Sequence, residues 1–110
     1  MNSKVILIVH GEPNSTFSEI LFKFFSSNKF RKMDKKIILI GSLKLLQKQM
    51  KILKYKIKFN EILDPCYSVK KLVNIINVDY KFKYPFSKIT KSSNQYIENC
   101  FDLSLKLIKK

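Results

Sequence analysis

A strand, a tight turn and the start of a helix follow one another between Lys4 and Leu21, in the stretch KVILIVHGEPNSTFSEIL. The segment from Val5 to Val9 is continuously aliphatic, a pattern typical of a strand that is covered on both faces in a parallel sheet. Gly11 and Pro13 then end the strand, because glycine permits a tight turn and proline donates no ladder hydrogen bond. Open α/β sheets bind ligands at the carboxyl ends of their strands. The sequence therefore predicts that residues 10–13 form a turn that faces a ligand crevice.

A helix is predicted to begin near Thr16 and to end at about Ser27. Its start is indicated by four possible N-cap residues, namely Asn14, Ser15, Thr16 and Ser18. Glu19 follows Thr16 at the spacing of a capping box. Apolar side chains continue at helical spacing, at Phe17, Leu21, Phe24 and Phe25. We expect this helix to aim its N-terminal amides at the crevice.

The same order of elements is predicted a second time in the first 55 residues. Residues 29–36 form a basic connector, residues 37–40 form a second buried strand, and Gly41 ends that strand. Ser42 is placed to cap the next helix, whose inward positions are predicted to be Leu45, Leu46, Gln49, Ile52 and Leu53. This alternation predicts an α/β fold with a mainly parallel sheet, in which right-handed crossovers bring the carboxyl ends of the strands to one edge.

The second half of the chain predicts two further strands and a last helix. Tyr55 to Ile62 alternates between apolar and polar residues, which indicates a half-exposed strand. Leu72 to Val78 is aliphatic but interrupted by Asn74 and Asn77, so we expect a strand near the edge of the sheet. In the segment 79–90 three aromatics alternate with lysines, and we interpret them as one packed face rather than as base-stacking groups. The helix is predicted from Ser92 through Leu107, with an inward stripe of Ile97, Cys100, Phe101, Ser104 and Ile108.

The net charge of +14 raises the question of a polyanionic ligand. Arg31 is the single arginine among 22 basic residues, whereas base readout and bidentate phosphate contacts favour arginine. Lysine, asparagine, isoleucine and phenylalanine have A/T-rich codons, so a biased genome would produce this charge without selection for binding. We expect a solvated lysine surface and no nucleic-acid partner. The alternative is a small basic α/β binding module for a polyanion or an acidic partner.

Other features predict one domain in the cytoplasm, with no metal centre of its own. The chain has no apolar run long enough to span a membrane and no convincing signal peptide. Cys66 and Cys100 are far apart in sequence, and we expect two reduced, partly buried thiols. His10 is the single histidine, so we expect it at the strand end, in contact with solvent or a backbone carbonyl.

Two segments resemble the 4-hydroxythreonine-4-phosphate dehydrogenases, the PdxA family of pyridoxal phosphate biosynthesis. Gly11-Glu12-Pro13, five further residues and Glu19-Ile20 are similar to the signature Gly-Glu-Pro-Ala-Gly-Ile-Gly-Pro-Glu-Ile that opens those enzymes. The stretch from Lys35 to Tyr55 is similar to their next strand, turn and helix. Ser15, Phe17 and Ser18 stand where the family usually has Gly, Gly and Pro.

The resemblance implies an incomplete three-layer αβα fold of the isocitrate and isopropylmalate dehydrogenase type. It implies an oxidoreductase that uses NAD and a divalent metal to oxidise 4-phosphooxy-L-threonine, followed by decarboxylation, in vitamin B6 biosynthesis. It also implies a homodimer, or a complementing catalytic half. Only the crevice-facing turn of Gly11, Glu12 and Pro13 is carried over as a cofactor-binding element, with Glu19 as an early helical acid. No catalytic residue and no metal ligand can be assigned.

The resemblance covers essentially the whole chain but only the front portion of a family member. We therefore expect residues 1–110 to form a single N-terminal α/β segment of a larger dehydrogenase fold. We also expect this 110-residue chain to be inactive alone.

Overall fold

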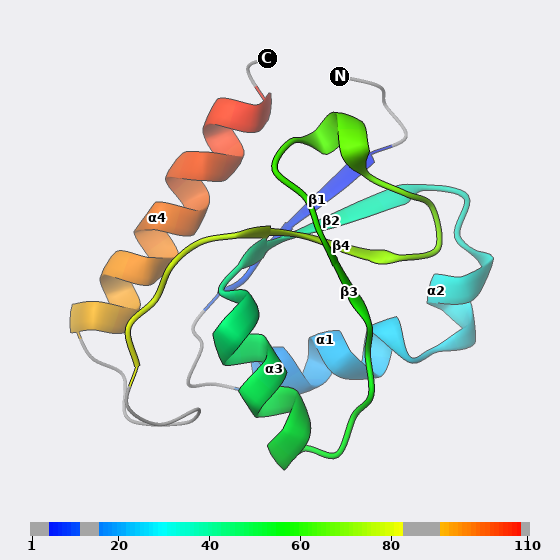
Figure 1. Ribbon diagram of the computed structural model, residues 1–110, viewed down its shortest axis with the longest axis horizontal. Coiled ribbons are helices and arrows are strands. Elements are labelled where there is room, and N and C mark those ends of the chain that lie inside the picture. Colours follow the sequence, from blue (N-terminus) through cyan, green and yellow to red (C-terminus); the bar gives the residue numbers. More distant parts are fainter. Residues whose placement is uncertain (1–4, 12–15, 83–90, 109–110) are drawn as a thin grey trace.

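A parallel sheet between two layers of helices forms the centre of the molecule (Figure 1). The computed structural model describes residues 5–11, 16–82 and 91–108. The sheet has four strands in the order β1-β2-β4-β3, and every pair of neighbours is parallel. The strands are β1 (Val5–Val9), β2 (Lys36–Gly41), β3 (Phe59–Glu61) and β4 (Val73–Asn77). This confirms the predicted α/β class with a parallel sheet.

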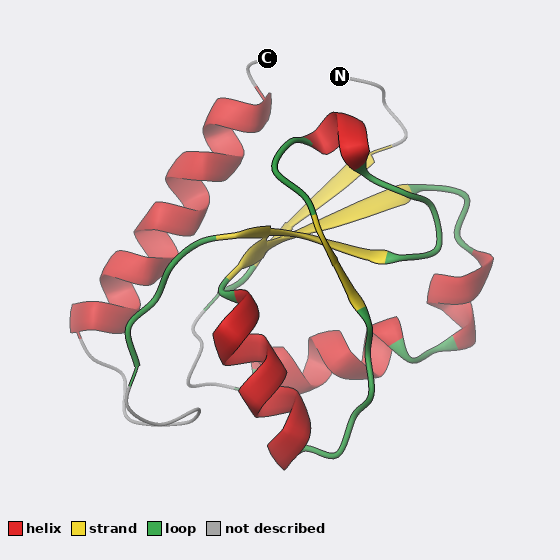
Figure 2. Cartoon of the chain, in the orientation of Figure 1, coloured by secondary structure: helices red, strands yellow, loops and turns green. Residues whose placement is uncertain are grey.

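Three helices cover one face of the sheet and a fourth covers the other (Figures 1 and 2). The helices are α1 (Phe17–Phe25), α2 (Asn28–Lys32), α3 (Leu43–Ile52) and α4 (Lys91–Ile108). A short 3-10 helix, η1 (Pro65–Tyr67), lies between β3 and β4. Helices α1 to α3 come from the crossovers that precede β3, and α4 follows β4. No described helix has both the length and the apolar composition needed to cross a membrane.

Alternation along the strands sends side chains into two separate cores. In β2, Ile37 and Leu39 join the core beneath α1, α2 and α3, whereas Ile38 and Ile40 join the core beneath α4. The register pairs Ile6 with Ile37 and Leu7 with Ile38, so β1 alternates in step with β2. Because β2 is an internal strand with helices on both faces, its aliphatic run is buried on both sides.

One prediction about strand position was wrong: β4 is an internal strand, although Asn74 and Asn77 had indicated a strand near the edge of the sheet. The strand β1 is an outer strand of the described sheet, and its half-buried side chains pack into the cores on both faces, as predicted. The Asn74 amide group donates to the carbonyls of Ile37 and Val69 at 2.9 Å, and its oxygen accepts from the Val69 N–H at 3.0 Å. These hydrogen bonds satisfy a polar side chain that would otherwise be costly to bury.

Several element boundaries also differ from the predictions. The basic connector contains α2, whose N-cap Ser27 accepts from the Phe30 N–H at 3.4 Å. The strand predicted from Tyr55 to Ile62 is regular only as β3, although its side chains alternate between half-buried and exposed from residue 55 to residue 58 as expected. Ser42 caps α3 as predicted, by accepting from the Leu45 N–H at 3.3 Å. Ile52 is 54% exposed, so the inward face of α3 ends before this residue.

Candidate functional site at the carboxyl edge of the sheet

The carboxyl ends of the strands bring polar residues together at one edge, as the topology predicts. His10 directly follows β1, Ser42 directly follows β2, and Asn77 is the last residue of β4. The Asn77 Oδ1 atom accepts from the Leu43 N–H at 2.9 Å, which ties the end of β4 to the first residue of α3. The edge is therefore a hydrogen-bonded unit rather than a set of independent loops.

His10 lies just beyond the carboxyl end of the outer strand β1 and has no solvent exposure. Its backbone N–H donates to the Ile40 carbonyl at 2.9 Å, which extends the β1–β2 ladder by one residue. Its side chain lies between the two helical layers, with Nδ1 2.6 Å from the Tyr96 hydroxyl and Nε2 2.9 Å from the Ser18 hydroxyl. The prediction of a histidine that touches solvent or a backbone carbonyl was wrong, because α1 and α4 close over the end of this strand.

The hydrogen-bond directions around His10 follow from the backbone. The Ser42 N–H donates to the Tyr96 hydroxyl oxygen at 2.8 Å, so this oxygen already acts as an acceptor. We assign the Tyr96 hydroxyl hydrogen to Nδ1 of His10, which leaves the Nε2–H to donate to Ser18. In this arrangement each of these donors faces an acceptor, and the network connects α1, β1, α3 and α4.

Gly41 allows the network to be this compact. A Cβ atom at this position would lie 2.8 Å from the Tyr96 hydroxyl and 2.9 Å from the His10 Cβ atom. Both distances are shorter than carbon contacts in folded proteins tolerate, so a larger residue would push α4 or the end of β1 away. The Tyr96 ring also stacks on Tyr80, with ring centroids 4.7 Å apart.

Burial sets the protonation states of the network. Desolvation lowers the pKa of His10 from 6.5 to about 4. Burial also raises the pKa of Tyr96 far above its usual value and the pKa of Cys100 to about 11. All three side chains are therefore neutral near pH 7. A general base works best when its pKa is near the operating pH, and the pKa of His10 is well below 7. We therefore assign the network a structural role: its hydrogen bonds hold the ends of β1 and β2 in position.

A cleft of about 360 Å³ opens beside the network, at the ends of β2, β3 and β4. Its lining combines hydrogen-bonding side chains with both signs of charge, at Ser42, Leu43, Lys44, Glu61, Asn77, Asp79, Tyr80 and Lys81. The Asn77 amide donates to the Asp79 carboxylate at 3.1 Å, which orients that carboxylate at the cleft. This volume lies within the range of small-molecule sites, so the cleft is a candidate ligand site on this edge.

The turn predicted to face the crevice is only partly described. Gly11 is half-buried and has no positive φ, and a Cβ atom there would lie 3.9 Å from the Phe17 ring, an ordinary contact. The strand ends before Gly11, as predicted, and the residue does not use the left-handed conformation that glycine permits. Glu12 and Pro13, the other two residues predicted for the turn, lie outside the described residues.

The predicted capping box does not form. Helix α1 begins after Thr16, as expected, but the Thr16 side chain makes no capping hydrogen bond among the described residues. The backbone of Thr16 is already helical, whereas a capping side chain reaches the next turn from an extended backbone. Instead, the Glu19 Oε1 atom lies 3.9 Å from the Nζ atom of Lys23, one turn further along the helix.

No metal centre can be built from the described part of the chain. It contains no group of three or more histidine, cysteine, aspartate or glutamate side chains that could hold an ion. Cys66 is exposed and Cys100 is buried, and neither forms a disulfide. The prediction of two partly buried thiols was therefore wrong for Cys66.

Sequence analysis missed two members of the His10 network, Ser18 and Tyr96. The inward stripe predicted on the last helix was correct for Cys100 and Ser104, which are buried. It was wrong for Phe101 and Ile108, whose side chains are 52% and 57% exposed. The buried stripe contains Ser93, Tyr96, Cys100, Ser104 and Leu107. The four-residue spacing from Tyr96 to Cys100 could have indicated that Tyr96 faces inward on this helix. No property of the sequence, however, pairs Tyr96 with His10, which lies 86 positions away.

Together, the parallel sheet, the two helical layers and the cleft at the carboxyl edge define a three-layer α/β protein. Comparison with solved structures finds α/β proteins with a similar fold. A 4-hydroxythreonine-4-phosphate dehydrogenase from Burkholderia phymatum matches 96% of this chain, with a TM-score of 0.83 and 16% sequence identity. A putative 4-hydroxythreonine-4-phosphate dehydrogenase from Salmonella typhimurium matches 97% of this chain, with a TM-score of 0.79 and 18% sequence identity. The 4-hydroxythreonine-4-phosphate dehydrogenase from Klebsiella pneumoniae matches 94% of this chain, with a TM-score of 0.76 and 15% sequence identity.

The match covers nearly all of this chain but only 33% to 34% of each of these three proteins. At such identities the likeness establishes the fold. No protein-family model matches the chain, and no curated protein sequence does. The resemblance predicted from Gly11-Glu12-Pro13 and from residues 35–55 is thus supported by an independent comparison of structures.

Proposed function

We propose that residues 1–110 form the N-terminal α/β segment of an NAD-dependent 4-hydroxythreonine-4-phosphate dehydrogenase. The reaction of such an enzyme oxidises 4-phosphooxy-L-threonine and is followed by decarboxylation, in pyridoxal 5′-phosphate biosynthesis. The observation that carries the proposal is the structural match over 94% to 97% of the chain to three proteins with this name. Of the signature-like residues, Gly11 lies just beyond the carboxyl end of β1, at the edge where open α/β sheets bind their ligands.

The role of this segment is to build one wall of the site. The buried network of His10, Ser18 and Tyr96 fixes the ends of β1 and β2 relative to α1 and α4. The adjacent cleft presents the Asn77–Asp79 pair and the exposed ammonium groups of Lys44 and Lys81 to a polar, phosphorylated substrate. NAD supplies the hydride acceptor when bound, and the turn of Gly11, Glu12 and Pro13 is the element of this chain proposed to lie against it.

The divalent metal implied by the family does not fit the described residues, because they offer no group of three or more ligands. We derive no step through a metal from this chain. In the proposal, the metal ligands and further groups that grip the substrate phosphate lie outside residues 1–110, either in the remainder of a longer chain that forms a homodimer or in a separate complementing catalytic half. No comparison favours the alternative of a stand-alone binding module.

The test is a spectrophotometric assay of NAD reduction with the purified 110-residue chain, 4-phosphooxy-L-threonine and a divalent metal. The expected result is no substrate-dependent formation of NADH above the rate without protein. NADH that forms in proportion to both protein and substrate would refute the proposal that the catalytic groups lie outside this segment. A matched reaction with the Burkholderia phymatum dehydrogenase controls for the quality of the substrate and the metal.

A further inference from the structure

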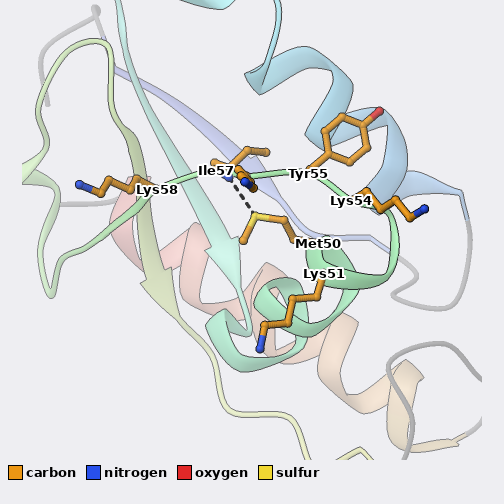
Figure 3. Close-up of a pocket in the computed structure, with 7 residues that line it drawn as sticks. Met50, Lys51, Lys54, Tyr55, Ile57 and Lys58 are labelled. Atoms are coloured by element: carbon orange, nitrogen blue, oxygen red, sulfur yellow. Dashed lines mark hydrogen bonds between the residues drawn. The ribbon is translucent and has the colours of Figure 1, made fainter.

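An apolar groove surrounded by lysines lies near the amino-terminal end of β3, and Figure 3 shows the residues that line it. It is formed by the last turn of α3 and by the extended segment that leads into β3. Its volume is about 570 Å³, and its lining residues are Met50, Lys51, Lys54, Tyr55, Lys56, Ile57 and Lys58. Because residues 55–58 precede β3, the groove is on the amino-terminal side of the parallel strands.

The floor of the groove is apolar and fixed in place. Tyr55 and Ile57 are half-buried and pack against the core beneath α1 to α3, as does Met50. The Ile57 N–H lies 3.1 Å from the Met50 sulfur, which holds the extended segment against α3 (Figure 3). An apolar group that enters the groove therefore meets a surface that is already formed, and it loses contact with water there.

The lysines around the groove are exposed and are not neutralised locally. Lys51, Lys54 and Lys58 extend from the groove in different directions (Figure 3). The described ion pairs, Lys23–Glu19 and Lys70–Asp34, involve other lysines. Moreover, the lining of the groove contains four lysines and no aspartate or glutamate. The groove therefore has a strong positive charge that an acidic ligand would complement.

The backbone at Lys54 supports a role for its side chain. Helix α3 ends in a Schellman motif, in which the Tyr55 N–H donates to the Met50 carbonyl at 3.0 Å and the Lys54 N–H donates to the Lys51 carbonyl at 3.3 Å. Lys54 occupies the left-handed position of this motif with a φ of 62°. Glycine is the usual residue at this position because it carries no Cβ penalty. A lysine here places a cation at the groove where a glycine would place none.

We propose that the groove binds an acidic linear protein segment that carries one aromatic or aliphatic anchor residue. The anchor side chain lies on Met50, Tyr55 and Ile57, and carboxylates on either side of it face the surrounding lysines. A nucleic acid fits less well, because its phosphates are not attached to an apolar anchor and the groove contains no arginine. This inference does not depend on the proposed dehydrogenase function, because it concerns residues that do not line the cleft.

The test measures the fluorescence anisotropy of a labelled ten-residue peptide of aspartates and glutamates with one central phenylalanine. The expected result is saturable binding to the 110-residue chain that weakens as salt is added. Replacement of the phenylalanine by alanine is expected to weaken binding about tenfold, because the apolar contact is lost. No saturable binding at low salt, or equal binding of the two peptides, would overturn the proposal.

Matched charge variants test whether the peptide binds in this groove. The double variant Lys54→Gln, Lys58→Gln is expected to weaken binding about three- to tenfold, the effect of two partly exposed ion pairs. The control variant Lys35→Gln, Lys106→Gln removes the same charge at exposed positions outside the groove and is expected to change binding less than twofold. Equal weakening by both variants would assign the binding to net charge alone. A single-stranded RNA that displaces the peptide at equal concentration from the wild type and from both variants would also overturn the proposal.

Discussion

The buried His10 predicts a specific dependence of stability on pH. In the unfolded chain this imidazole takes up a proton near its ordinary pKa of 6.5, whereas in the folded protein burial lowers its pKa to about 4. Below pH 6.5 the unfolded state therefore binds more protons than the folded state, and the free energy of unfolding falls as the pH falls. The His10 contribution is complete above pH 6.5 and is lost progressively between pH 6.5 and pH 4. Its size is about 3 kcal/mol, since each pKa unit corresponds to about 1.4 kcal/mol.

Two measurements check this prediction. Urea denaturation of the wild type and of His10→Gln between pH 7.5 and pH 4 should give stabilities whose difference shrinks by about 3 kcal/mol on acidification, because glutamine does not titrate. His10 is the single histidine, so its ring signals can also be followed directly by proton NMR in the folded wild type. A difference in stability that does not change with pH, or a His10 titration midpoint near 6.5, would refute the assignment of a buried neutral imidazole.

Four substitutions test other parts of the fold by urea denaturation. Gly41→Ala should lower the free energy of unfolding by about 2 kcal/mol, because the new Cβ atom would lie 2.8 Å from the Tyr96 hydroxyl. Gly11→Ala should change it by less than about 0.5 kcal/mol, because the new Cβ atom would lie 3.9 Å from the Phe17 ring, an ordinary contact. Similar effects of these two variants would contradict the described packing. Asn74→Leu should lower the free energy of unfolding by about 3 kcal/mol, because the Ile37 carbonyl and the Val69 carbonyl and N–H lose their hydrogen-bond partner. A neutral effect would argue against an internal β4. Lys54→Gly should stabilise by about 1 kcal/mol because it relieves a left-handed backbone, and any loss of stability would contradict the Schellman motif.

Local patterns in the sequence predicted the type of each element better than its place in the sheet. The aliphatic runs of β1 and β2, the glycine that ends β2 and the Ser42 cap of α3 are all features of consecutive residues, and the structure confirms them. The order β1-β2-β4-β3 depends instead on which strands pair across long separations. Asn74 suggested an edge strand because a polar side chain is costly to bury, and the partners that satisfy it lie on other segments.

The candidate site was predictable in position but not in composition. Parallel strands place their carboxyl ends together, so the edge that contains His10 and Ser42 followed from the βαβ order. The network at that edge requires Tyr96, which reaches His10 and Ser42 from a helix on the opposite face. Helical periodicity placed Cys100 and Ser104 inward correctly, and Ile97 packs partly against the core, but Phe101 and Ile108 were chosen in place of the buried Tyr96 and Leu107.

The central claim is that this chain is one segment of a larger dehydrogenase fold, and native mass spectrometry of the protein from its own cells tests it most directly. The chain itself has a mass of 13.0 kDa. Since it spans 33% to 34% of three structural neighbours, the account predicts that the polypeptide that starts with these residues occurs in a particle at least about three times heavier. That particle would be either a longer chain or a complex with a complementing half. A free monomer of 13.0 kDa with no associated chain would contradict the account.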